Sequence, residues 1–261
     1  MKKKYKRAIV IPDTHFPYQD NRAMNVVYHA IRKVEPDVFI SLGDLGEWES
    51  VSHWNWKKKK KPSLEYLLPI VDEEIKKVNR EIDRLDMHLD HAGVSERIVL
   101  TGNHDEWIND FSAYYPYLKG YTFEKACKFD KRGWDVKPHN EPFRYGGSKL
   151  VMIHGAFTCV HHAKKHALVY GCNILYGHTH DIQRYTMTRY EDGTIQSLSL
   201  GCLKDCSREV NKFVKSIPNW GHAFAIIDFF NDGNFSLQLV EVIKGKNGKA
   251  RTSLWGEIIE G

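Results

Sequence analysis

The stretch Ala8-Ile9-Val10-Ile11-Pro12-Asp13-Thr14-His15 places a carboxylate and an imidazole directly after a short run of apolar residues. Such a run is typical of a buried strand, and the proline that follows favours a strand end. A second run, Asp37 to Leu42, stops in the same way at Gly43-Asp44. Between the two runs, apolar residues from Ala23 to Val34 recur at helical spacing, and the helix is expected to stop near Pro36. This part of the chain therefore predicts a β-α-β unit with carboxylates at its strand ends.

Three further apolar runs end in residues that can bind a metal. They are Arg97–Leu100 before Gly102-Asn103-His104-Asp105, Leu150–Ile153 before His154, and Asn173–Tyr176 before Gly177-His178-Thr179-His180. In an α/β sheet, the carboxyl ends of the strands are where loops gather polar groups on a rigid frame. So many oxygen and imidazole groups would repel one another, or stay unpaired at a cost of several kcal/mol. The sequence therefore predicts that two divalent cations hold them together.

The sequence after His180 alternates between apolar and polar residues. Two pairs of alternating segments, each around a short turn, are expected to form antiparallel strands: 184–189 with 194–200, and 222–230 with 235–243. We expect this last third of the chain to supply a second sheet that packs on the first.

Two long segments interrupt the predicted strands, at about 48–93 and 106–145. The first contains a helical apolar face between Ile70 and Leu89, and the second is rich in aromatic residues. Each follows a loop with candidate metal ligands, so each is expected to be an insertion that caps the site. Residues 1–261 are expected to form one domain, because 42% hydrophobic content supports one substantial core.

The composition sets further expectations. A formal charge of +5 mildly favours an anionic partner such as a nucleotide or nucleic acid. Five cysteines without a Cys-x-x-Cys spacing indicate neither a disulfide framework nor a zinc knuckle, and a reducing cytoplasm fits best. Cys202 and Cys206 are interpreted as buried small hydrophobic residues. The first apolar run is too short for a signal-peptide core or a membrane span, so no membrane association is expected. The oligomeric state is not indicated.

Taken in order, the motifs Asp-x-His, Gly-Asp, Gly-Asn-His-Asp, His and Gly-His-x-His resemble those of the calcineurin-like metallophosphoesterase family. The resemblance covers residues 8–180. It implies an α/β fold, a four-layer αββα sandwich of two mixed sheets flanked by helices. It also implies the ligands: Asp13, His15 and His180 for one metal, Asn103, His154 and His178 for the other, and Asp44 bridging both. Because these ligands are nitrogen and oxygen without thiolate, they suit Mn²⁺, Fe, Zn, Ni or Co better than Ca²⁺. Among these metals Mn²⁺ is our first expectation.

The resemblance further implies a phosphate-ester hydrolase in which two cations about 3.5–4 Å apart activate a shared water. Asn103 and His104 would contact the substrate, and His104 would donate a proton to the leaving oxygen, an effect typically worth ~10²–10⁴ in rate. Glu47 is the first candidate to orient His104, and Asp105 is the second.

Trp48 stands where the protein-phosphatase branch of this family has an arginine that binds the substrate phosphate. We therefore expect a phosphodiesterase or nuclease that acts on nucleotides or nucleic acid. A phosphomonoesterase for phosphoproteins or small metabolites is the first alternative. A metal-binding scaffold without catalysis is the second.

The lysine run of the first segment has two interpretations. Lys57, Lys58, Lys59, Lys60 and Lys61 would neutralise nucleic-acid phosphates while Trp48, Trp54 and Trp56 stack on bases. The favoured interpretation is a solvated loop whose tryptophans anchor the segment.

Two other groups are expected to be structural rather than functional. Tyr114, Tyr115 and Tyr117 are expected to pack in the core of the second segment rather than to line a substrate cleft. His161, His162 and His166 are expected to be surface histidines, because the glutamate of a His-Glu-x-x-His metal site is missing.

Overall fold

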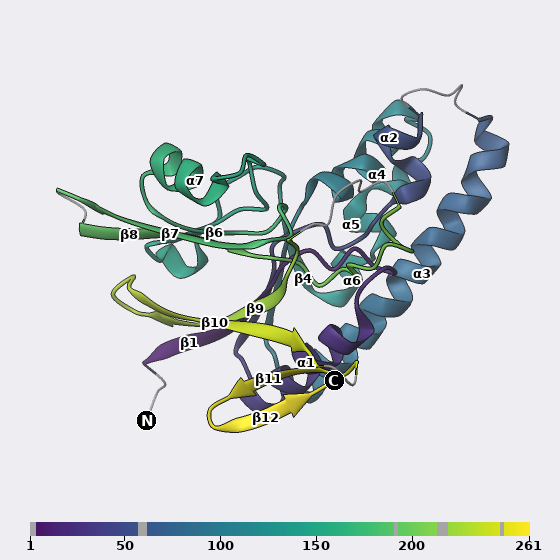
Figure 1. Ribbon diagram of the computed structural model, residues 1–261. Helices are drawn as coiled ribbons and strands as arrows, with labels where there is room; N and C mark the ends of the chain where they lie inside the picture. The colour runs from purple at the N-terminus through teal and green to yellow at the C-terminus, as the bar shows by residue number, and fades with distance from the viewer. Residues whose placement is uncertain (1–3, 57–61, 191–192, 213–218, 246–247) are drawn as a thin grey trace.

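Two mixed sheets pack face to face with helices on their outer faces in the computed structural model, which describes residues 4–56, 62–190, 193–212, 219–245 and 248–261 (Figure 1). The larger sheet contains, in spatial order, β12 (Glu257–Glu260), β11 (Ala250–Leu254), β10 (Phe235–Lys244), β9 (His222–Phe230), β1 (Tyr5–Ile11), β2 (Val38–Ser41), β3 (Glu96–Leu100) and β4 (Trp134–Lys137). The smaller sheet contains β5 (Leu150–Met152), β6 (Asn173–Tyr176), β8 (Gly193–Leu200) and β7 (Ile182–Arg189).

Both sheets combine parallel and antiparallel strands. Strands β1 to β4 are parallel, whereas β9 pairs antiparallel with β1 and continues into the β10–β12 meander. In the smaller sheet, β5, β6 and β8 are parallel and β7 is antiparallel to β8. The expectation that the last third of the chain forms a sheet of its own is therefore wrong. Its strands extend both sheets, because β8 pairs with β6 and β9 takes the free edge of β1.

Three apolar cores separate the four layers. Along β1, Ala8 and Val10 face the smaller sheet while Ile9 and Ile11 face the helices, as the two-residue period of a strand requires. The smaller sheet alternates in the same way, with Leu175 in the core between the sheets and Ile174 in the outer one. The αββα sandwich of two mixed sheets is thus confirmed.

Helices α1 (Asn21–Val34) and α3 (Leu64–His91) pack together over the outer face of the larger sheet, and α7 (His162–Tyr170) covers the smaller sheet (Figure 1). Helix α1 begins where Asp20 accepts hydrogen bonds from the backbone N–H groups of Arg22 and Ala23. None of the helices in the described ranges has the length and apolar character needed to cross a bilayer.

The first expected insertion contains η1 (Glu49–Val51), α2 (His53–Trp56) and α3. The second contains most of α4 (Asn103–Tyr114), then η2 (Lys119–Tyr121), α5 (Phe123–Ala126), α6 (Phe129–Arg132), β4 and the start of η3 (Tyr145–Gly147). Because β4 is an edge strand of the larger sheet, part of this segment belongs to the core rather than to an insertion. The lysines at 57–61 lie outside the described residues.

The expectation of surface histidines in α7 is wrong for two of the three. His162 and His166 are buried, and only His161 is exposed. His162 Nδ1 lies 2.6 Å from the Tyr176 hydroxyl and its Nε2 lies 3.0 Å from Asp181 Oδ2. Burial lowers the pKa of His166 to about 4, and its Nε2 accepts a hydrogen bond from the backbone of Ala156. The i, i+4 spacing places both rings toward the sheet, where other segments supply their polar partners.

Candidate metal centre

The loops after five strands bring all seven predicted ligands to one place between the sheets. Asp13 and His15 follow β1, Asp44 follows β2, and Asn103 is the first residue of α4 after β3. From the smaller sheet, His154 follows β5, and His178 and His180 follow β6. The ligand atoms form two compact groups.

The first group consists of Asp13, His15 and His180, whose ligand atoms lie within 4.8 Å of one another. The Nε2 atoms of His15 and His180 are 3.0 Å apart, and Asp13 Oδ2 lies 3.2 Å from His180 Nε2. The Asp13 carboxylate also accepts hydrogen bonds from the backbone N–H of His178, which ties β1 to the loop after β6.

The second group consists of Asp44, His154 and His178, again within 4.8 Å. His154 Nε2 lies 3.3 Å from Asp44 Oδ2, 3.0 Å from Asn103 Oδ1 and 3.2 Å from His178 Nδ1. His154 Nδ1 lies 3.1 Å from the Leu42 carbonyl, to which its N–H donates, and this leaves Nε2 directed at the group. Asp44 Oδ2 is also 3.8 Å from His15 Nε2 of the first group. One oxygen therefore stands between the two groups, as a bridging ligand would.

The backbone of these loops is held in uncommon conformations. His15, Asp44, His178 and His180 all have positive φ, between 48° and 68°. Such angles are unfavourable for side chains other than glycine and persist where the surrounding structure over-determines them. Gly177 adds a close approach, because a Cβ there would lie 2.0 Å from Asp13 Oδ1. The loops are thus shaped to bring ligand atoms together.

The electrostatics of the centre match a cation site. Burial lowers the pKa of His15 and His178 to about 4, so both rings are neutral ligands at neutral pH. Although burial favours the neutral acids, the His154 ring keeps the pKa of Asp13 and Asp44 below the usual range. Burial opposes the charge of His154 in turn, but Asp44 and Asp13 raise its pKa to about 9. A proton on His154 therefore balances the charges of Asp13 and Asp44 at the place where these ligands would hold a metal.

His104, the predicted proton donor, lies beside this centre. Its backbone N–H donates to Asp44 Oδ1 at 2.8 Å, and its ring Nδ1 lies 2.9 Å from the Glu47 carbonyl oxygen. The Glu47 carboxylate is 3.9 Å from the same Nδ1 and 2.7 Å from His15 Nδ1. The Glu47 main chain therefore contacts the His104 ring, while its carboxylate contacts the first ligand group.

Asp105, the second candidate to orient His104, does a different task. Its buried carboxylate accepts hydrogen bonds from four N–H groups, those of the backbone of Leu45, Gly46 and Gly102 and the indole of Trp48. Burial and the charge of Asp44 raise the pKa of Asp105 to about 7, although these hydrogen-bond donors act to lower it. Asp105 thus fastens the loop after β2 to the start of α4.

Lys204 is a site residue that the motifs did not reveal. Its side chain is buried, and its Nζ lies 2.7 Å from Glu47 Oε2. Although burial favours the neutral acid, His15 and Lys204 help to lower the pKa of Glu47 to about 2. Lys204 follows the apolar end of β8, so the strand-end rule that located the ligands would have identified it.

A cleft of about 640 Å³ lies between the two segments and reaches the second ligand group at Asn103. Its walls come from both segments and are largely aromatic: Val51, His53, Trp54 and Leu67 on one side, and Trp107, Asp110, Phe111, Tyr114 and Tyr115 on the other.

Tyr114 and Tyr117 are 64% and 97% exposed, so the expectation that these tyrosines pack in a core is wrong for both. Trp48 is fully buried and anchors its segment, whereas Trp54 is 69% exposed.

A model of the calcineurin-like phosphoesterase family matches residues 6–182, more than half of the chain, and the chain therefore belongs to this family. Over nearly its whole length it is also similar to the gene 54 protein of Mycobacterium phage L5, at 27% identity over 92% of this chain and 95% of the relative. Among solved structures, Vacuolar Protein Sorting 29 from Cryptosporidium parvum matches 99% of both chains at 13% identity and a TM-score of 0.47. The phosphoesterase YfcE from E. coli matches 89% of this chain and 98% of its own at 13% identity and a TM-score of 0.39.

The first prediction concerns the structural task of Asp105. Asp105→Asn replaces one acceptor oxygen by an NH₂ group that faces N–H donors, so we expect the free energy of unfolding to fall by about 2–5 kcal/mol. Urea unfolding of the metal-free protein measures this. Asp130→Asn, which removes an exposed ion pair with Lys125, is the control and should leave the free energy of unfolding nearly unchanged. Equal stability of the two variants would contradict the assignment.

The second prediction is a pH dependence of metal binding. The proton on His154 must leave before its Nε2 can bind a metal, and the pKa of this ring in the metal-free protein is about 9. Affinity for Mn²⁺ should therefore rise about tenfold per pH unit from neutral pH and level off above about pH 9. Competition with a chelating dye measures this slope. In His154→Asn the slope should disappear, and a flat profile in the unmodified protein would refute the prediction.

Proposed function

We propose that this protein is a metal-dependent phosphodiesterase that acts on nucleotides or nucleic acid. The observation that carries the proposal is the aromatic cleft that reaches Asn103 at the edge of the ligand groups. A cleft of this volume accommodates a nucleotide, and exposed aromatic rings stack on bases at about 1–3 kcal/mol for each base. The net charge of +5 supports an anionic substrate.

The donor set supports two divalent cations, of which manganese is our first choice. Asp13, His15 and His180 would hold one, Asn103, His154 and His178 the other, and Asp44 both. When bound, the pair would grip the phosphoryl oxygens and lower the pKa of a water molecule to near neutrality. Neutral imidazoles and carboxylates without thiolate favour Mn²⁺, Fe, Co, Ni or Zn over Ca²⁺.

The chain itself would deliver a proton to the leaving oxygen. His104 Nδ1 is engaged by the Glu47 carbonyl, so Nε2 is the nitrogen that remains for the substrate. The ring is held between Trp107, at 3.9 Å between centroids, and His15, at 4.6 Å. A ring fixed on both sides keeps its donor atom in one position, which general-acid catalysis requires. We propose that Glu47 is the residue that orients His104.

The presence of Trp48 supports a phosphodiester substrate rather than a phosphoprotein. The place where a protein-phosphatase branch would have an arginine is occupied by this buried indole, which donates to Asp105. An arginine gives bidentate recognition of the terminal phosphate of a monoester, and an indole cannot replace it.

The third prediction tests the reaction. The protein, reloaded with Mn²⁺, should hydrolyse bis-nitrophenyl phosphate faster than the nitrophenyl monoester and should cleave a cyclic nucleotide or single-stranded nucleic acid. Asp44→Asn should lose at least about 10²-fold in kcat, because the oxygen between the two ligand groups is lost. Full activity of Asp44→Asn would assign the hydrolysis to a contaminant.

Two further outcomes distinguish the alternatives. Faster turnover of the monoester, without nucleic-acid cleavage, would identify a phosphomonoesterase. Failure to cleave any ester, with two metals bound, would identify a non-catalytic scaffold. Trp54→Ala should raise KM for nucleotide substrates without changing their kcat, because stacking on this exposed indole binds the base and takes no part in the hydrolysis.

The fourth prediction concerns His104. In His104→Ala, kcat should fall by about 10²–10⁴ for a substrate with an alkoxide leaving group and much less for nitrophenolate, which leaves without a proton. Metal content, measured by elemental analysis, should stay the same. His161→Ala, an exposed histidine of the same chain, is the control. Equal losses for poor and good leaving groups would exclude proton donation by His104.

A further inference from the structure

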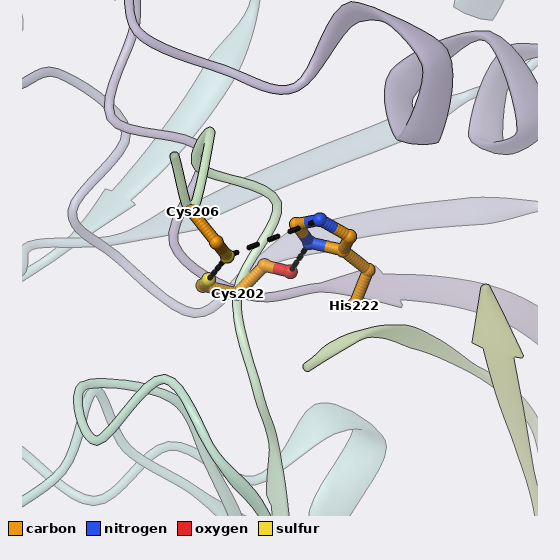
Figure 2. A group of neighbouring side chains, drawn as sticks. All are labelled: Cys202, Cys206 and His222. Atoms are coloured by element: carbon orange, nitrogen blue, oxygen red, sulfur yellow. Dashed lines mark hydrogen bonds between the residues drawn. The ribbon is translucent and has the colours of Figure 1, made fainter. Parts of the chain in front are cut away.

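A second cluster of possible ligands lies at the end of β8, outside the groups described above. Cys202, Cys206 and His222 have their ligand atoms within 4.8 Å of one another. Figure 2 shows the two sulfur atoms and the imidazole turned toward one another, from a loop and from the start of β9. Cys202 is buried, His222 is 7% exposed, and Cys206 is partly accessible, which leaves a route for an ion.

We propose that Cys202, Cys206 and His222 form a third metal site that binds Zn²⁺. A tetrahedral zinc site, with Zn–S near 2.3 Å and Zn–N near 2.0–2.1 Å, places two sulfurs about 3.8 Å apart and a sulfur and a nitrogen about 3.5 Å apart. Here the two Sγ atoms are 3.9 Å apart, and Cys206 Sγ is 3.9 Å from His222 Nε2. The cluster is therefore already close to the spacing that the ion requires.

The imidazole is oriented as a zinc ligand. His222 Nδ1 lies 3.0 Å from the Cys202 carbonyl oxygen, so its N–H donates there and Nε2 faces the sulfurs. A backbone carbonyl in this place is the usual outer partner of a metal-binding histidine, because it fixes the tautomer and the ring orientation. The same residue thus supplies one ligand through its side chain and positions another through its main chain.

Zinc binding also has a proton balance. The ion needs both sulfurs as thiolates and the imidazole neutral, so binding would release the protons that these groups hold in the metal-free protein.

The fourth position is assigned to a solvent molecule. Among the described residues, the nearby Asp20 carboxylate is engaged, since its Oδ2 pairs with Lys244 Nζ at 2.5 Å and lies 3.6 Å from His222 Nε2. The Lys204 carbonyl lies 3.4 Å from Cys206 Sγ and 4.0 Å from Cys202 Sγ, where it accepts from the thiols when no ion is bound. Thiolate ligands select zinc over manganese, so this site and the nitrogen–oxygen centre would hold different metals.

Cobalt distinguishes this site from the other two. In the full chain kept reduced by a phosphine, Co²⁺ should produce thiolate charge-transfer absorption that disappears when Zn²⁺ is added. Asp44→Asn should retain this absorption, since the centre around Asp44 has no sulfur ligand. Cys206→Ser should lose it and should bind Zn²⁺ more weakly by more than the ~10–100-fold that loss of an outer partner costs. Cys159→Ser, at an exposed cysteine, is the matched control.

A measurement on the unmodified protein tests the proposal even if the variants do not fold. Zn²⁺ should protect the partly accessible Cys206 from alkylation by iodoacetamide, read by peptide mass spectrometry, while Cys159 reacts at the same rate with and without zinc. Three results would overturn the proposal. They are the absence of thiolate–cobalt absorption, its persistence in Cys206→Ser, and alkylation of Cys206 that zinc does not slow.

Discussion

The centre depends on one buried carboxylate. Asp44 Oδ2 lies between His154 of one ligand group and His15 of the other, and its Oδ1 accepts the backbone N–H of His104. The side chain is only 2% exposed, so water cannot compensate its charge. A buried carboxylate is stable only if other groups supply donors or positive charge. The loops after β3 and β5 meet at this residue for that reason, and the same carboxylate positions the backbone of His104, which we propose as the proton donor.

The segments that follow the loops form the walls of the site. The carboxylate of Asp105 binds the loop after β2 to the first turn of α4, and the segments that leave these two points form opposite walls of the cleft. The cleft therefore has a fixed position relative to Asn103, because one set of hydrogen bonds sets both the ligand loops and the starts of the walls. Trp48, whose indole donates to Asp105, is buried as part of this set of hydrogen bonds, and Trp54 faces the cleft.

Features that depend on a short stretch of sequence could be predicted from the sequence alone. Each predicted ligand follows an apolar strand within a few residues, so the strand-end rule located Asp13, Asp44 and His154 without knowledge of the fold. It missed features whose partners lie far away in the chain. His162 is buried because Asp181 and the Tyr176 hydroxyl satisfy it, and β4 is recognisable only by its pairing with β3. The positions 57–61 lie outside the described residues, so the interpretation of the lysine run is still a prediction.

The loop after β8 connects the two kinds of site. Between Cys202 and Cys206, the backbone N–H of Leu203 donates to the Asp13 carbonyl, and Lys204 contacts the Glu47 carboxylate. The five-residue segment from Cys202 to Cys206, with a hydrogen bond and an ion pair to the centre, gains rigidity if an ion fixes both of its ends to β9 through His222. An ion there would hold Lys204 near Glu47 and so influence the residue that orients His104, without contact with the substrate. If the proposed ion binds, ordering of the second site and geometry of the first would be linked through one short segment.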